Sequence, residues 1–127
     1  MTIYIFGNPI EPSDSLPVQL IPILKKEFPD ITFIHADPTE NWWQGEKEIV
    51  ILDTVKGIDK VTLLKDLDAF QKQSMITPHD YDVYVDLMLM KKIREITSVT
   101  IIGIPVGYLQ TNILIQCKNI LTNRIIY

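Results

Sequence analysis

The six residues EIVILD, at positions 48–53, form the most apolar segment of the chain and indicate its fold class. Four consecutive branched aliphatic residues are typical of a strand that is buried on both faces, as in the centre of a parallel sheet. Four further segments with β-branched and aromatic residues are predicted strands, and three longer segments with helical periodicity are predicted helices. The predicted strands cover residues 2–6, 31–35, 60–67 and 99–104, and the predicted helices cover residues 16–28, 78–93 and 109–123.

The order of these segments predicts the architecture. Helices that alternate with apolar strands imply a three-layer α/β/α fold, in which a mostly parallel central sheet of about five strands is covered on both faces. The alternating pattern of residues 60–67 places that strand near an edge of the sheet. The length of 127 residues predicts a single domain, residues 1–127. In such folds ligands bind beyond the carboxyl ends of the strands, so functional residues are expected in the loops that follow them.

Each predicted helix carries an apolar face that we expect to be turned toward the sheet. Pro22 is expected to kink the first helix, because proline lacks an N–H group and crowds the preceding turn. Cys117 is the only cysteine, so no internal disulfide forms, and we expect it to be a buried, unreactive thiol. The three faces comprise Leu16, Leu20, Ile23, Leu24 and Phe28, then Val83, Leu87, Met90 and Ile93, and finally Ile113, Cys117, Ile120 and Leu121.

The composition excludes several classes of protein. A hydrophobic content of 46% with 22% charged residues argues against disorder. The net charge of -4, without a run of Lys or Arg, argues against a nucleic-acid partner. No apolar segment reaches the roughly 20 residues that cross a bilayer, and the N-terminus lacks the pattern of a secretion signal. We therefore expect a cytoplasmic protein with no membrane span.

Three polar residues are candidates for a functional site at the carboxyl ends of the strands. Asp14 lies in the loop between the first strand and the first helix, Asp53 ends the central strand, and His79 opens the second helix. Each residue also has a purely structural interpretation. Asp14 would cap the first helix, Asp53 would cap the turn that follows it, and His79 would be a solvated residue at a helix start.

The segment TPHD, at residues 77–80, has the form of a capping box. Thr77 would be the N-cap, Pro78 would occupy the first helical position, and Asp80 would reach back to the cap. His79 then lies in the first helical turn, where the helix dipole disfavours the imidazolium ion. The neutral imidazole is the form that binds a metal.

Together the three candidates form a mixed oxygen and nitrogen ligand set. Such a set suits nickel, zinc, manganese or iron better than magnesium or calcium. Three protein ligands also leave coordination positions open for a substrate. We therefore predict that Asp14, Asp53 and His79 form a metal-binding and catalytic site.

The same residues resemble the motifs of the maturation endopeptidases of nickel–iron hydrogenases. That family opens with a strand and a Gly-Asn-x-Leu loop followed by an acidic pair, which FGNPIEPSD at residues 6–14 approximates, with Ser13 in place of the first acid. The family's strand that ends in aspartate is matched by VILD at residues 50–53. Its histidine at the start of the next long helix is matched by MITPHD at residues 75–80. A later strand ending in Gly-Ile-x-Pro is approximated by IIGIP at residues 101–105.

The resemblance extends over residues 3–105 and implies a specific function. It implies an endopeptidase that removes the C-terminal extension of a hydrogenase large-subunit precursor after nickel insertion. It also implies that Asp14, Asp53 and His79 complete the coordination of a nickel ion that the substrate supplies, with other divalent metals as alternatives. The metal would polarise the scissile carbonyl, activate water or only position the peptide, and a carboxylate would equally serve as the general base.

Two other functions are compatible with the sequence. A non-catalytic relative would bind nickel or hydrogenase subunits without cutting, and Ser13 is in keeping with that interpretation. A receiver-like phosphoacceptor domain is also a small α/β domain with an aspartate at the end of a central strand. Receivers place their acids directly after the first strand, whereas Asp14 follows the predicted strand by eight residues.

Overall fold

The computed structural model describes residues 1–37, 39–65, 78–108 and 110–125, and the side chains of residues 78–82, 124 and 125 lie outside this description. The strands are β1 (Thr2–Ile5), β2 (Thr32–His35), β3 (Glu48–Val55), β4 (Thr62–Leu64) and β5 (Ser98–Pro105). The helices are α1 (Leu16–Glu27), α3 (Pro78–Lys92) and α4 (Gln110–Ile120), and a π-helical turn, Leu121–Ile125, follows α4.

The five strands form one sheet in the order β2-β1-β3-β5-β4. β1 pairs in parallel with β2 and β3, and β3 pairs in parallel with β5 along its whole length, from Glu48↔Ser98 to Val55↔Pro105. The short strand β4 pairs antiparallel with β5 at the edge. The apolar segment 48–53 therefore lies in the central strand. The predicted mostly parallel sheet is confirmed, and so is the predicted position of the strand within residues 60–67 at its edge.

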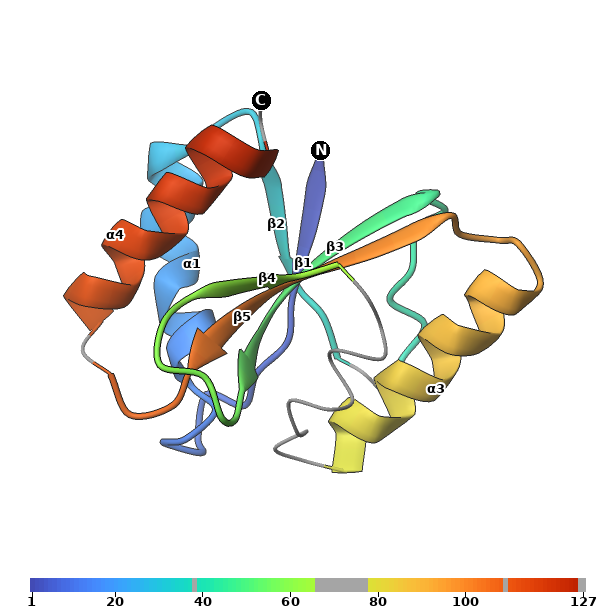
Figure 1. The fold of residues 1–127 in the computed structure, drawn as a ribbon, viewed down its shortest axis with the longest axis horizontal. Helices are drawn as coiled ribbons and strands as arrows, with labels where there is room; N and C mark the ends of the chain where they lie inside the picture. Colours follow the sequence, from blue (N-terminus) through green and yellow to red (C-terminus); the bar gives the residue numbers. More distant parts are fainter. Residues whose placement is uncertain (38, 66–77, 109, 126–127) are drawn as a thin grey trace.

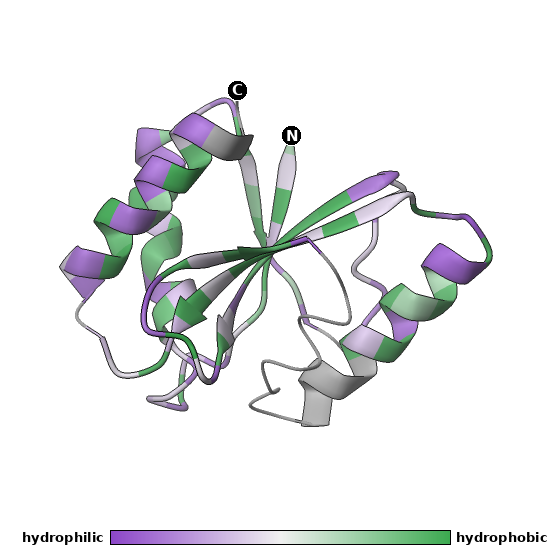
Figure 2. Cartoon of the chain, in the orientation of Figure 1, coloured by the Kyte–Doolittle hydropathy of each residue, from purple (hydrophilic) through white to green (hydrophobic). Residues whose placement is uncertain are grey.

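The sheet lies between two helical layers, with α1 and α4 on one face and α3 on the other (Figure 1). Side chains alternate along β3, so Ile49 and Ile51 belong to the core beneath α3, whereas Leu52 belongs to the core beneath α1 and α4. The central strands are accordingly among the most hydrophobic parts of the chain (Figure 2). The predicted three-layer α/β/α architecture is confirmed.

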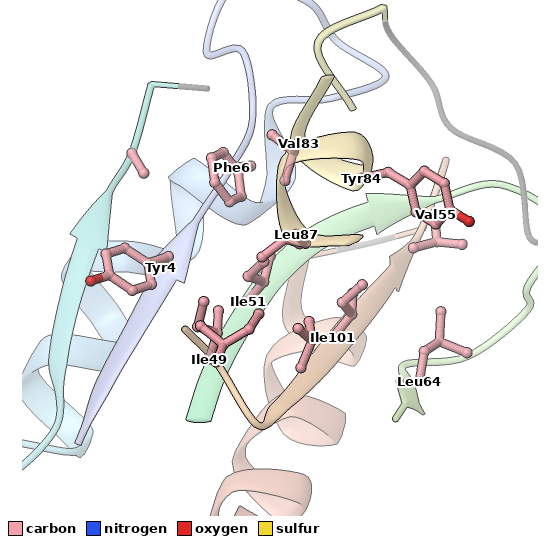
Figure 3. Close-up of a cluster of buried hydrophobic side chains, with 13 residues drawn as sticks. Tyr4, Phe6, Ile49, Ile51, Val55, Leu64, Val83, Tyr84, Leu87 and Ile101 are labelled. Atoms are coloured by element: carbon pink, nitrogen blue, oxygen red, sulfur yellow. The ribbon is translucent and has the colours of Figure 1, made fainter. Parts of the chain in front are cut away.

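The two cores are built from the predicted helix faces. Beneath α3, Val83 and Leu87 pack with Ile51 of the central strand (Figure 3). On the opposite face, α1 and α4 contribute Leu20 and Cys117, which are fully buried. Burial raises the pKa of the Cys117 thiol to about 12, as expected for the buried, unreactive thiol that the sequence predicts.

The connection between β2 and β3 covers part of the sheet with aromatic residues. The ring of Trp42 packs edge-on against Tyr4, at a centroid distance of 4.9 Å, and against Phe6, at 5.3 Å. The Tyr4 hydroxyl donates to the Glu46 carboxylate at 2.7 Å, and burial raises the pKa of Tyr4 to about 12. These contacts fix the connection over the same face of the sheet that α3 covers.

One boundary differs from the prediction in a way that affects the candidate site. β3 continues two residues beyond its predicted end, because Thr54 and Val55 remain paired with β5. Asp53 therefore lies within the central strand and not at its end. α1 continues through Pro22 to Glu27.

Within the described ranges, no helix combines the length and hydrophobicity that spanning a bilayer requires.

The prediction that Ile93 faces the core is wrong, since 57% of this residue is exposed. α3 ends at Lys92, and Arg94 adopts a left-handed conformation with φ of 63°. The Arg94 N–H donates to the Lys91 carbonyl at 3.2 Å, and the Glu95 N–H donates to the Met90 carbonyl at 2.9 Å. This pair of hydrogen bonds is a Schellman motif, which turns the chain out of the helix before residue 93 can reach the sheet.

The left-handed residue that ends α3 offers a test of this local geometry. A side chain at φ of 63° is strained, whereas glycine adopts this conformation freely, so Arg94→Gly is expected to stabilise the protein by about 1 kcal/mol. Arg94→Ala removes the same side chain but keeps the strain, and it serves as the control. Urea unfolding measures both variants, and equal stabilities for glycine and alanine would contradict the motif.

Candidate functional site

The topology places a switch point at the carboxyl ends of β1 and β3. From β1 the chain passes through α1 to β2 on one side, and from β3 it passes to β4 and β5 on the other side. β1 and β3 are neighbours, so their connections leave in opposite directions at this point of the sheet. Ligands of open α/β sheets bind at such switch points. Asp14 follows β1, and Asp53 lies near the end of β3, so both candidate carboxylates belong to this region.

Asp14 is held in a defined position by hydrogen bonds to its carboxylate. The Thr54 hydroxyl of β3 donates to Oδ1 at 2.6 Å, and the Asn8 N–H donates to Oδ2 at 3.1 Å. The residue is only 5% exposed. The N-cap of α1 is Ser15, so the alternative interpretation of Asp14 as that N-cap is wrong. The carboxylate instead ties the loop after β1 to the central strand.

Gly7 permits this arrangement of the loop. A Cβ atom at position 7 would lie 2.8 Å from the backbone oxygen of Asp14 and 3.1 Å from Val18 Cγ2. The Asn8 N–H also donates to that same Asp14 oxygen at 3.1 Å. The Gly-Asn pair after the first strand therefore has a structural role, because it lets the loop return closely enough to place Asp14 against β3.

Asp53 is buried in the central strand, with 3% of its surface exposed. Its Oδ1 accepts a hydrogen bond from the Thr54 N–H at 2.8 Å. Asp53 shares its strand face with Ile51, and it therefore points toward the layer of α3, whereas Thr54 points toward the layer of α1. Asp14 and Asp53 thus both accept a hydrogen bond from Thr54 of β3, Asp14 from its hydroxyl and Asp53 from its N–H.

His79 is the second described residue of α3, which spans Pro78–Lys92. α3 covers the face of the sheet toward which Asp53 points (Figure 1). The His79 side chain and the Thr77 cap lie outside the described residues. Among the side chains that are described, no group of three or more His, Cys, Asp or Glu residues is arranged to hold a metal ion. The three-residue metal site therefore stays a prediction. The structure describes the side chains of two of its members, Asp14 and Asp53.

The other histidine has a structural role. His35 Nε2 lies 3.0 Å from the Gly7 carbonyl oxygen, which only accepts hydrogen bonds, so this nitrogen carries the proton. The bond connects the end of β2 with the loop after β1.

A cavity of about 230 Å³ adjoins the Asp14–Thr54 pair. It lies between the starts of α1 and α4 and the loop that follows β5, and Thr54 forms part of its wall. Its other lining residues are Pro12, Ser13, Ser15, Leu16, Gln19, Pro105, Val106, Gly107, Tyr108 and Gln110. Sequence reasoning missed Thr54 and this cavity. The signal for Thr54 is its position directly after Asp53, because neighbouring residues of a strand point to opposite faces.

The Thr54–Asp14 hydrogen bond can be tested without knowledge of a substrate. Thr54→Val keeps the shape of the side chain but leaves a buried carboxylate oxygen without this donor, so we expect a loss of about 1–3 kcal/mol of stability. Thr54→Ser keeps the hydroxyl and is the matched control. Urea unfolding measures the difference, and a valine variant as stable as the serine variant would contradict the assigned contact.

Solved structures with the same fold include "hydrogenase maturating endopeptidase HybD from E. coli", with a TM-score of 0.63 and 15% identity, over 89% of this chain and 79% of that one. A second is "an endopeptidase from Escherichia coli", with a TM-score of 0.60 and 18% identity, over 83% and 74%. A third is "hydrogenase 3 maturation protease", with a TM-score of 0.54 and 17% identity, over 85% and 76%. No protein-family model and no curated protein sequence matches the chain. At these identities the similarity establishes the shared fold.

Proposed function

We propose that this chain is a divergent hydrogenase maturation endopeptidase, which removes the C-terminal extension of a hydrogenase large-subunit precursor after nickel insertion. The shared fold supports the proposal, since two of the similar structures are a hydrogenase maturating endopeptidase and a hydrogenase 3 maturation protease. The observation that carries it is the position of Asp14. Its carboxylate is buried and bonded to the residue that follows Asp53, at the switch point of the sheet.

In the proposed reaction the substrate brings its own nickel ion to this edge of the sheet. Asp14, Asp53 and the imidazole of His79 complete the coordination of the ion, and they thereby place the scissile peptide bond over the ends of β1 and β3. A nickel ion held there would polarise the scissile carbonyl or activate the attacking water. Thr54 and Asn8 hold the Asp14 carboxylate in a fixed orientation before the substrate arrives.

A non-catalytic binding protein of the same fold is the second candidate function. It is favoured by Ser13, which replaces an acid of the family's motif and whose hydroxyl donates to the Glu11 carboxylate at 3.1 Å. The receiver-like alternative is disfavoured, because the edge strand β4 runs antiparallel, whereas the receiver sheet is parallel throughout. The difference between the two remaining candidates is whether the precursor is shortened.

Incubation with a nickel-loaded large-subunit precursor tests the proposed reaction. We expect the native protein to shorten this precursor, as seen by gel shift and by mass spectrometry of the product, and to leave the nickel-free precursor intact. His79→Ala is expected to abolish processing, because it removes the nitrogen ligand, while it costs less than about 1 kcal/mol of stability at a helix start. Asp14→Asn and Asp53→Asn are expected to abolish processing as well.

His35→Ala is the control for loss of a histidine, since His35 bonds a backbone carbonyl and is not assigned to the site. Circular dichroism and urea unfolding establish that each variant is folded. Processing at the native rate by the His79→Ala variant would show that the site is wrongly assigned. Binding of the precursor without shortening would favour the non-catalytic function.

A further inference from the structure

The cavity beside Thr54 has a chemical character that bears on substrate choice. We propose that it is a specificity subsite that receives one uncharged side chain of the polypeptide substrate close to the scissile bond. This inference rests on the proposed endopeptidase function, and it adds the class of side chain that the enzyme accepts next to the cut.

The position of the cavity links it to the reacting groups. Thr54 lines the cavity and also donates the 2.6 Å hydrogen bond to Asp14, so one residue separates the cavity from the candidate catalytic carboxylate. The cavity lies at the carboxyl ends of β3 and β5, on the edge of the sheet where substrates of this fold class bind. A peptide held over Asp14 and Asp53 would therefore pass within reach of it.

Among the described residues that line the cavity, none has a charged side chain. The polar members of this lining are serine, threonine, glutamine and tyrosine residues, and its apolar members are proline, leucine and valine residues. Within this wall the Ser15 hydroxyl accepts a hydrogen bond from Gln19 Nε2 at 3.0 Å. Such a surface offers hydrogen bonds to neutral groups, whereas a charged group would lose its hydration without gaining an ion pair.

Two electrostatic contributions oppose each other when the side chain in the cavity is an anion. The N-terminal ends of α1 and α4 border the cavity, and helix dipoles favour negative charge at this end. The Asp14 carboxylate lies directly behind Thr54 and repels an anion. For a cationic side chain the two contributions have the opposite sign: the helix ends repel it and the Asp14 carboxylate attracts it. This attraction gives no direct ion pair, because the Asp14 oxygens already accept hydrogen bonds from Thr54 and Asn8. An uncharged side chain avoids both costs.

The size of the cavity fits a single side chain. Its volume of about 230 Å³ lies below the roughly 300 Å³ at which pockets for drug-sized ligands begin. Several residues that line the cavity are exposed, among them Gly107 and Tyr108, so the cavity reaches the surface. A chain that passes over the edge of the sheet can therefore insert one side chain while its backbone stays outside.

A charge introduced into the wall provides the test. Gln110 is the first residue of α4 and is exposed, so Gln110→Glu keeps the size of the side chain, agrees with the helix dipole and adds one negative charge to the lining. Asn112→Glu adds the same charge to an exposed position of the same helix that does not line the cavity, and it is the matched control. The substrates are the nickel-loaded precursor and two variants of it. In one variant lysine replaces the residue directly before the cut, and in the other lysine replaces the residue directly after it.

We expect the native enzyme and the Asn112→Glu control to cleave one of the lysine precursors at least about tenfold less efficiently than the unaltered precursor. Gln110→Glu should restore much of kcat/KM for that lysine precursor alone. No restoration by Gln110→Glu, or equal restoration by Asn112→Glu, would overturn the subsite while the endopeptidase function stands. Failure of the native protein to cleave any unaltered precursor would overturn the proposed function, and the subsite with it.

Discussion

The hydrogen bond between the Thr54 hydroxyl and the Asp14 carboxylate is the contact on which the geometry of the candidate site depends. It joins two segments that are 40 residues apart in the sequence and is buried, so water does not compete with it. Through it the loop after β1 is held against β3 at the point where the connections of the sheet diverge. The close return of that loop also requires Gly7, since any larger residue would collide with the backbone of Asp14.

The hydrophobic sheet provides the fixed platform for this contact. β3 is paired on both sides, with β1 and with β5, and its aliphatic side chains fill the two cores beneath the helical layers. Such burial makes the positions of Asp53 and Thr54 insensitive to local movement. The polar residues can then lie within a strand at low exposure, because each accepts or donates a hydrogen bond there. The loops and helix starts around them supply the variable part of the site, including the cavity.

The sequence predicted the architecture well because period-2 and helical patterns are direct consequences of burial on a sheet. The central place of residues 48–53 and the presence of a helix over residues 78–92 followed from such patterns. It predicted less of the site, because contacts between distant segments leave no periodic signal. The bond from Thr54 to Asp14 depends on how the β1–α1 loop folds back, and the two extra residues of β3 depend on pairing with β5. The exposure of Ile93 likewise depends on a left-handed residue that is not a glycine.

We propose that two carboxylates and one imidazole meet at the switch point between β1 and β3. A crystal structure of the protein grown with Ni²⁺, with anomalous diffraction to locate bound nickel, tests this claim directly. We expect a carboxylate oxygen of Asp14, one of Asp53 and an imidazole nitrogen of His79 to lie within about 3–5 Å of one another, as ligands that share one metal do. Side chains of these residues directed into separate regions, with no common space between them, would contradict it.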